Sequence, residues 1–353
     1  MRLYNVELFS PDFEYRSSAQ VDAIEHAFDY MDVEKARIEL PGQIKVQKGD
    51  WIHIQRSGFE ANGILSEINK KEQNLELQYK PFHKIFDIDI FVNMESLAAM
   101  TLERWLEQLI SGIYIQNDDV LQNIKGLEIE VLSEHDGATL ENYQTGVNNL
   151  YDIILDAFVV YGIVCEFHMD VQEKRLILRI GSVTAEKFTI EADLNNILEK
   201  SITIKEAKES TNKLIIYNED DYTKKVIYFR NLDNQITMED RNRELPVVCD
   251  TVTVKVRNGR TFEETAAKKA GNTLKASIYD NLIEITVALE DELVRPTERR
   301  IGQQADIISG GICYHTILTA MKYDENKMML IFGAIRLELT KQLKRRFRQW
   351  ELR

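Results

Sequence analysis

The chain has 353 residues, more than the roughly 250–300 residues that one hydrophobic core supports, so two to four domains are expected. Hydrophobic residues make up 44% of the chain, with 16 Gly and 5 Pro, which excludes a disordered chain and argues against long flexible linkers. The net charge of −14 repels phosphate backbones and so argues against adhesive binding of nucleic acid. Two interpretations of the acidic charge remain. It either lines a path along which DNA moves without binding, or it only maintains solubility.

Three cysteines, Cys165, Cys249 and Cys313, are far apart and flanked by apolar residues. Their odd number and spacing predict small buried side chains in a protein made in a reducing cytoplasm. No apolar stretch follows the single positive charge near the N-terminus, so no signal peptide is expected. The most apolar run, 153–167, contains two acidic residues and is too short to span a bilayer.

Alternating apolar and polar residues predict antiparallel strands in the first ninety residues. Glycine-containing turn signals separate these segments, a spacing typical of a small sandwich or barrel. We therefore expect a first β-barrel domain over 1–92. Its predicted strands are 37–40, 51–55, 63–68 and 75–79.

Helical spacing of apolar residues then predicts an α+β insert domain over 93–186. Its first helix begins after Ser96 or Thr101, either of which can cap it, and its second helix ends at Gly162. The predicted elements are helices over 96–110 and 145–161 and strands over 163–169 and 175–180.

A second α+β region is expected over 187–276, followed by a second β-barrel domain with a C-terminal helix over 277–353. Thr261 and Glu264 form a possible capping box at the start of a helix. The predicted elements are strands over 213–218 and 225–229, a helix over 261–276, and strands over 282–289, 305–308, 312–319 and 328–332. The fold class is α+β and mainly β.

The first and last β-rich regions share one pattern of strand, glycine turn, strand, glycine-containing hairpin, long strand, polar turn and strand. Gly49 and Gly58 are 9 residues apart, and so are Gly302 and Gly311. Two similar small barrels in one chain explain this correspondence, and chance similarity of two β-rich stretches is the alternative.

These two series resemble the tube-forming domains of the phage tail-tip or baseplate hub family. That family includes the N-terminal hub module of tail-associated lysins and the central hub of contractile tails. The closing segment, Met329-Leu-Ile-Phe-Gly-Ala-Ile-Arg336 followed by Leu339-Thr-Lys-Gln-Leu343, resembles the end of such modules, as does Ile301-Gly-Gln-Gln-Ala-Asp-Ile307 with its Gly310-Gly311 hairpin. The likeness covers the whole chain as an order of domains, barrel, insert, second region and barrel.

The resemblance implies a homotrimer whose two barrels per subunit alternate into a six-fold-like ring continuous with the tail tube. It also implies a distal tail protein and a tape-measure protein as partners, with receptor-binding or other tip proteins as further ones. DNA passes through such a ring without specific binding. The implied location is the virion tail tip, after synthesis in the bacterial host cytoplasm. Many lysin-type relatives continue into a hydrolase, and this sequence ends at Arg353, so lytic activity is not expected.

No enzyme motif, cofactor site or metal site is expected from the sequence. HExxH, CxxC, a Gly-x-Ser-x-Gly elbow, a Walker loop and a dinucleotide fingerprint do not occur. Cys313 and His315 share one strand face and could begin a catalytic or zinc site, but a buried cysteine beside an ordinary histidine is the preferred interpretation. Asn218-Glu-Asp-Asp221 lacks the ligand spacing of a calcium loop and predicts a hairpin tip. Other acidic pairs, such as Glu134 with Asp136 and Asp118 with Asp119, are interpreted as polar loops.

The predicted C-terminal helix carries an apolar stripe on a basic background, the one pattern that suggests a functional surface. A basic amphipathic helix can lie on a membrane or enter a groove of a partner. On so acidic a chain, docking against its own body or a neighbouring subunit is the simpler use. The candidate assembly residues are Leu339, Leu343, Phe347 and Trp350.

The sequence thus predicts a structural, non-enzymatic hub of a phage tail tip. Two alternatives stay open. The first is the hub of a tail-like bacteriocin or injection device, which would share the fold. The second is a cell-wall hydrolase whose catalytic site has no recognisable motif.

Overall fold

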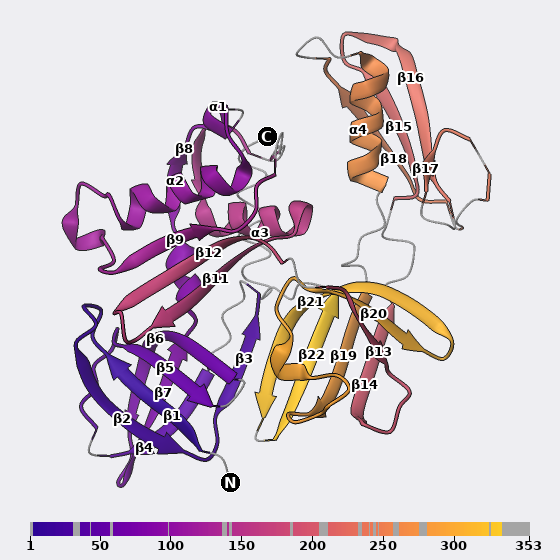
Figure 1. The fold of residues 1–353 in the computed structure, drawn as a ribbon. Helices are drawn as coiled ribbons and strands as arrows, with labels where there is room; N and C mark the ends of the chain where they lie inside the picture. The colour runs from indigo at the N-terminus through magenta and orange to yellow at the C-terminus, as the bar shows by residue number, and fades with distance from the viewer. Residues whose placement is uncertain are drawn as a thin grey trace. The chain divides into compact units, whose positions relative to one another are not determined.

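The computed structural model describes most of the chain, in two compact units. The described residues are 3–30, 36–42, 44–56, 59–97, 99–135, 140, 143–183, 186–204, 211–231, 235–239, 241–242, 245, 247–256, 261–274, 281–324 and 326–333. The first unit comprises Met1–Ser201 and Ile283–Arg353, and the second comprises Ile202–Leu282. The chain is mainly β, in agreement with the predicted class (Figure 1).

The first unit contains an open 13-stranded sheet built from both ends of the chain. Its N-terminal strands are β1 (Tyr4–Phe9), β2 (Tyr15–Val21), β3 (Glu25–Asp29), β4 (Ala36–Pro41), β5 (Trp51–Arg56), β6 (Phe59–Lys70) and β7 (Asn74–Lys80). The others are β13 (Phe188–Glu191), β14 (Ile197–Ile204), β19 (Asn281–Ala288), β20 (Gln304–Ser309), β21 (Ile312–Asp324) and β22 (Lys327–Gly333).

Two regions of this sheet are joined through one antiparallel strand pair, β3 with β21. The main path runs β14-β19-β22-β21-β3-β4-β7-β6-β5-β1-β2, and β20 pairs both β21 and β13. Among the described residues no ladder closes either the N-terminal set of strands or the C-terminal set on itself, so neither region is a closed barrel. The alternating burial of β4 and β13 is that of strands with one face toward a core.

The two regions repeat one strand order. β4, β7, β6 and β5 are successive neighbours, and so are β19, β22, β21 and β20. The long strand of each set is bent by a register shift, at Leu65 in β6 and at Leu318 in β21. This shared connectivity is what the internal-repeat hypothesis requires.

The hydrogen bonds at the two bends also match. Gly49 donates its N–H to the Leu65 carbonyl at 2.9 Å, and Leu65 donates to the Asp50 carbonyl at 2.8 Å. Gly302 donates to Leu318 at 2.8 Å, and Leu318 donates to Gln303 at 2.9 Å. Both glycines have a left-handed backbone, with φ of +91° and +86°, which explains why glycine is found there.

The insert lies between β7 and β13 along the chain and forms its own layers. A three-stranded sheet, β11-β12-β9, is made from β9 (Leu127–Val131), β11 (Ile163–Asp170) and β12 (Arg175–Ser182), and β8 (Asp89–Val92) pairs β10 (Gly146–Asn149). Helices α2 (Leu102–Tyr114) and α3 (Leu150–Tyr161) pack on the three-stranded sheet (Figure 1). Short helices are η1 (Phe82–Phe86), α1 (Met94–Leu97), η2 (Val120–Gln122) and η4 (Pro296–Glu298).

Both insert helices carry the predicted end signals. The Thr101 side chain accepts a hydrogen bond from the Arg104 N–H, and Gly162 ends α3 in the left-handed region. The predicted start of the second helix is too early, because 146–149 pair with β8 as strand β10 and Asn149 begins the helix.

The second unit packs one helix on a four-stranded sheet ordered β17-β16-β15-β18. Its elements are β15 (Lys213–Asn218), β16 (Asp221–Arg230), β17 (Ile236–Thr237), β18 (Cys249–Val254) and α4 (Phe262–Leu274). Thr261 and Glu264 form the predicted capping box, since each side chain accepts the other's N–H. The tip from Asn218 to Asp221 is a hairpin turn, as expected. The core comprises Leu214, Ile216, Val254, Phe262, Ala266, Ala270 and Leu274.

The prediction of three buried cysteines is wrong for two of them. Cys165 is buried, but Cys249 and Cys313 are exposed. Apolar residues close to these two cysteines are themselves exposed, Ile312 by 56% and Val247 by 39%, so apolar flanks do not indicate burial here. None of the described helices is long and apolar enough to cross a membrane.

Candidate functional site

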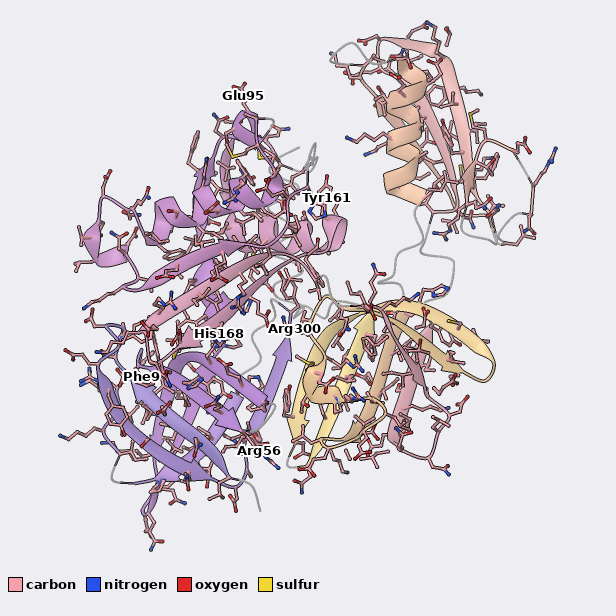
Figure 2. All side chains as sticks on the ribbon, in the orientation of Figure 1. Phe9, Arg56, Glu95, Tyr161, His168 and Arg300 are labelled. Atoms are coloured by element: carbon pink, nitrogen blue, oxygen red, sulfur yellow. The ribbon has the colours of Figure 1, made fainter. Side chains whose placement is uncertain are left out.

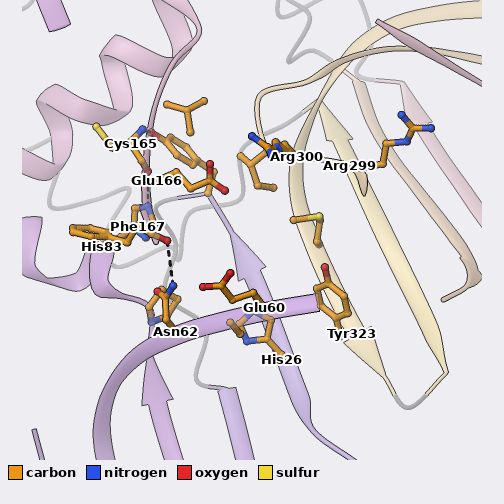
Figure 3. Close-up of a pocket in the computed structure, with 16 residues that line it drawn as sticks. His26, Glu60, Asn62, His83, Cys165, Glu166, Phe167, Arg299, Arg300 and Tyr323 are labelled. Carbon is orange, nitrogen blue, oxygen red and sulfur yellow. Dashed lines mark hydrogen bonds between the residues drawn. The ribbon is translucent and has the colours of Figure 1, made fainter. Parts of the chain in front are cut away.

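A cluster of polar and aromatic side chains in the first unit lies where the N-terminal strands, the insert and the C-terminal strands meet (Figure 3). We call this place the junction. A cavity of about 120 Å³ is found there. Figure 2 shows Arg300 and His168 at the borders of this junction. Residues that line the cavity include His26, Tyr30, Glu60, Asn62, His83, Cys165, Glu166, Phe167, Arg300 and Tyr323.

The junction exists because β11 is an edge strand whose outer backbone groups need partners. Three side chains from the N-terminal region supply them. The Cys165 N–H donates to the Tyr30 hydroxyl at 3.0 Å, and the Cys165 carbonyl accepts from His83 Nε2 at 2.6 Å. Asn62 donates from Nδ2 to the Phe167 carbonyl at 3.2 Å. These hydrogen bonds attach the insert through its backbone. The attachment therefore does not depend on particular insert side chains.

Tyr30 contacts all three parts of the junction. Its backbone N–H donates to the Thr319 carbonyl of β21 at 2.8 Å, and its hydroxyl accepts from β11. Its ring lies 4.2 Å from the ring of Phe158 in α3, between centroids. The side chain is 1% exposed. Because one buried residue connects three elements, Tyr30 fixes their mutual arrangement within this unit.

Two histidines in the junction are held neutral. Burial lowers the pKa of His26 and of His83 to about 4. His26 Nδ1 shares a hydrogen bond with the Tyr79 hydroxyl at 2.8 Å, and its ring stacks on the Tyr79 ring. His83 donates to a carbonyl, which fixes its Nε2–H tautomer. Neutral rings in fixed hydrogen bonds contribute packing and geometry.

Glu60 connects the N-terminal strands to the outer side of β11. Its carboxylate lies 3.1 Å from His168 Nδ1 and 3.5 Å from His53 Nε2. Burial opposes ionisation of Glu60, but hydrogen bonding to His53 and the charge of His168 outweigh it and lower the pKa of Glu60. The same network extends to Glu7, 3.3 Å from His53.

The junction does not have the geometry of a nucleophilic active site. Burial raises the pKa of the Cys165 thiol to about 12, so the thiolate is not formed at neutral pH. The neighbouring His83 bonds to the Cys165 carbonyl, whereas a general base must reach the thiol. The arrangement therefore supports positioning rather than catalysis.

Two of the acidic residues singled out in the sequence are used in local structure, while Asp136 lies outside the described residues. Glu134 pairs with Arg104 at 3.0 Å, and Asp119 caps η2 by accepting the Leu121 N–H. Cys313 and His315 do lie on one face of β21, where they meet Asp306 of β20. Burial together with Asp306 raises the pKa of the Cys313 thiol.

The four candidate assembly residues of the C-terminal helix, Leu339, Leu343, Phe347 and Trp350, lie outside the described residues. Their role therefore stays a prediction. No local pattern in the sequence indicates Tyr30 or its hydrogen bonds to β11 and β21, because these bonds join residues far apart in the chain.

No protein-family model matches the chain, and no curated protein matches its sequence. Solved structures do match its fold over nearly its full length. The tail protein from Neisseria meningitidis MC58 matches with a TM-score of 0.56 and 12% identity, covering 93% of this chain and 96% of that chain. The 43 kDa tail protein of prophage MuSo2 from Shewanella oneidensis gives 0.55 and 12%, covering 94% and 98%. A chain of the phage P2 baseplate in its activated conformation gives 0.51 and 12%, covering 94% and 98%.

At such identities the likeness is one of fold. The chain has the fold of phage tail and baseplate proteins, as the resemblance in the sequence predicted.

Proposed function

We propose that this protein is the structural hub of a phage tail tip or baseplate. In this proposal three copies form a ring that continues the tail tube, anchors other tip proteins and surrounds the path of the DNA. The shared fold with tail and baseplate proteins supports a structural role.

The duplicated strand quartet carries the proposal. β4-β7-β6-β5 and β19-β22-β21-β20 have one order, and Gly49 and Gly302 make equivalent hydrogen bonds at the two bends. A subunit with two similar modules presents six modules when three copies are arranged around an axis. Three subunits are therefore able to meet a six-fold tube, as the hub resemblance implies. In this arrangement the two modules, each an open set of strands, lie within the domains expected at 1–92 and 277–353.

The proposed partners follow from the same role. A distal tail protein would adjoin one face of the ring, the tape-measure protein would enter its channel, and receptor-binding or other tip proteins would attach outside. The net charge of −14 supports a channel wall that does not retain DNA, since a cationic wall would bind phosphates by releasing counterions. We propose the virion tail as the location.

We propose a function without catalysis. The buried Cys165, whose thiol has a high pKa, supports this part of the proposal. A cell-wall hydrolase is the rival function. Purified protein incubated with peptidoglycan, with and without divalent metal, should leave it intact. Hydrolysis that a point substitution in this chain abolishes would contradict the proposal.

Electron microscopy of the purified protein tests the ring directly. The expected particle is a three-fold ring whose central hole is surrounded by six similar densities, two from each subunit. Particles without a hole, or with only three densities around it, would contradict the proposed arrangement.

A further inference from the structure

A compact set of metal-ligating side chains lies on the solvent-facing side of the β20–β21 hairpin. Asp306 is directly opposite His315 in the antiparallel register, and Ile308 is opposite Cys313. Because side chains alternate along a strand, Asp306, Cys313 and His315 share one face. The other face carries Ala305 and Ile307, which are fully buried. The core thus fixes the strands that present the three polar groups.

The donor atoms of the three side chains converge on one point. One carboxylate oxygen of Asp306, Cys313 Sγ and His315 Nδ1 all lie within 4.8 Å of one another. Nδ1 of His315 is hydrogen-bonded to Asp306 and lies 4.0 Å from Cys313 Sγ. A catalytic relay needs the two ring nitrogens on different partners. Here the same nitrogen, His315 Nδ1, faces both Asp306 and Cys313. Three donor atoms that face one another in this way suit a shared ion better than a relay.

A cation already lies at this point. The Lys187 ammonium is 2.6 Å from Asp306 Oδ1 and 3.4 Å from His315 Nδ1. The cluster therefore already holds a positive charge beside two of its three donors.

We propose that Asp306, Cys313 and His315 bind a zinc ion, with solvent as the fourth ligand. Thiolate, imidazole and carboxylate are the three ligand types that zinc accepts, and zinc distances of about 2.0–2.3 Å place tetrahedral donors roughly 3.3–3.6 Å apart. Cys313 and His315 are exposed, so their side chains are free to rotate toward the half-buried Asp306 and close the donors to that spacing. On binding, the Cys313 thiol releases its proton to solvent, the hydrogen on His315 Nδ1 is replaced by one on Nε2 through exchange with solvent, and the Lys187 ammonium withdraws. An ion would pin the tip of the hairpin in the C-terminal module.

Cobalt titration of the full-length protein tests the site, because a cobalt–thiolate bond gives a charge-transfer absorption that carboxylate and imidazole alone do not. The wild-type protein should develop this band, and zinc should displace the cobalt. Cys313→Ser should remove the band. Cys249→Ser is the matched control, because Cys249 is also an exposed strand cysteine, and it should keep the band.

Zinc calorimetry separates a binding site from a surface ion-pair cluster. Asp306→Asn and His315→Gln should each weaken zinc binding at least about tenfold. Lys187→Met should strengthen it, because the competing ammonium is gone. Thermal unfolding of each apo variant near the wild-type temperature shows that the fold is kept. A wild type without the cobalt–thiolate band, a band that survives in Cys313→Ser, or zinc binding unaffected by Asp306→Asn and His315→Gln would overturn the proposal.

Discussion

Gly302 repeats the structural position of Gly49. Each has a left-handed backbone, precedes a strand of its module and donates its N–H to a leucine at the bend of the long strand. Their surroundings differ. An added Cβ at Gly49 meets nothing within 4 Å, whereas at Gly302 it lies 2.6 Å from Val164 and 3.0 Å from Val183 of the insert. The two modules share a backbone design, and the insert packs against the bend of the second one.

This difference predicts unequal costs for the same substitution. Gly49→Ala should destabilise the protein by about 1–3 kcal/mol through backbone strain alone. Gly302→Ala should cost about 1–3 kcal/mol more, because its methyl group overpacks against Val164. Chemical denaturation followed by tryptophan fluorescence measures both, and Gly49→Ala is the matched control. Equal losses in the two variants would contradict the close approach of the insert to Gly302.

Tyr30→Phe tests the fastening of β11. Loss of the hydroxyl leaves the buried Cys165 N–H without its acceptor, so about 1–3 kcal/mol of stability should be lost. Tyr15→Phe is the control, since the Tyr15 hydroxyl bonds only to Ser18 on the surface, and its cost should be within about 0.5 kcal/mol. If the two variants had the same unfolding midpoint, the hydroxyl of Tyr30 would not hold the junction.

The buried histidines predict loss of stability in mild acid. The pKa of His26 and of His83 is about 4 in the fold, against an ordinary value of 6.5. Between these values the unfolded chain binds protons that the folded chain does not, so this stability is present above pH 6.5 and is lost as the pH falls toward 4. Each histidine accounts for up to about 3 kcal/mol at the acid end.

Urea midpoints at pH 7 and pH 5 measure this effect. His83→Gln can still donate to the Cys165 carbonyl, and the variant should show a smaller difference between the two pH values than the wild type. Adding His26→Gln should reduce the difference between the two midpoints further. The carboxylates titrate in the wild type and in both variants, so they do not account for the change. An unchanged pH dependence in the double variant would show that these rings are not the groups responsible.

Truncation after Gly333 tests the predicted C-terminal helix as an assembly element. Leu339, Leu343, Phe347 and Trp350 each contribute about 1.5–3 kcal/mol when fully buried. Their removal should weaken ring formation or docking of tail partners while the remaining chain stays folded. Sedimentation of the shortened and full-length proteins at matched concentrations measures this. Normal assembly by the shortened chain would show that the stripe is not an interface.

Local signals in the sequence predicted most strands and helix ends, because alternation, capping residues and Gly162 act within a few residues. Hairpins between sequence neighbours account for β5-β6-β7 and for β20-β21-β22, whereas β4 with β7 and β19 with β22 pair strands that are separated in sequence. The β3–β21 pair, the addition of β13 and β14 to the C-terminal strands, and the junction around Tyr30 were not predicted. These contacts join residues far apart in the chain, and a single sequence carries no local pattern for them.

The Cys313 cluster shows the same limit. The sequence indicates that Cys313 and His315 share a strand face, but it carries no signal for Asp306. Asp306 reaches them only through the hairpin register. The burial of Cys313 was mispredicted because its apolar neighbour Ile312 is itself exposed.

The mass of the assembled protein tests the central claim most directly. Native mass spectrometry over a range of concentrations should show a species of three times 41.0 kDa that becomes dominant as concentration rises. Three copies carrying two modules each are what a six-module ring requires. A protein that remains a monomer throughout, or closes as a dimer or a hexamer, would contradict a hub built on the duplicated strand quartet.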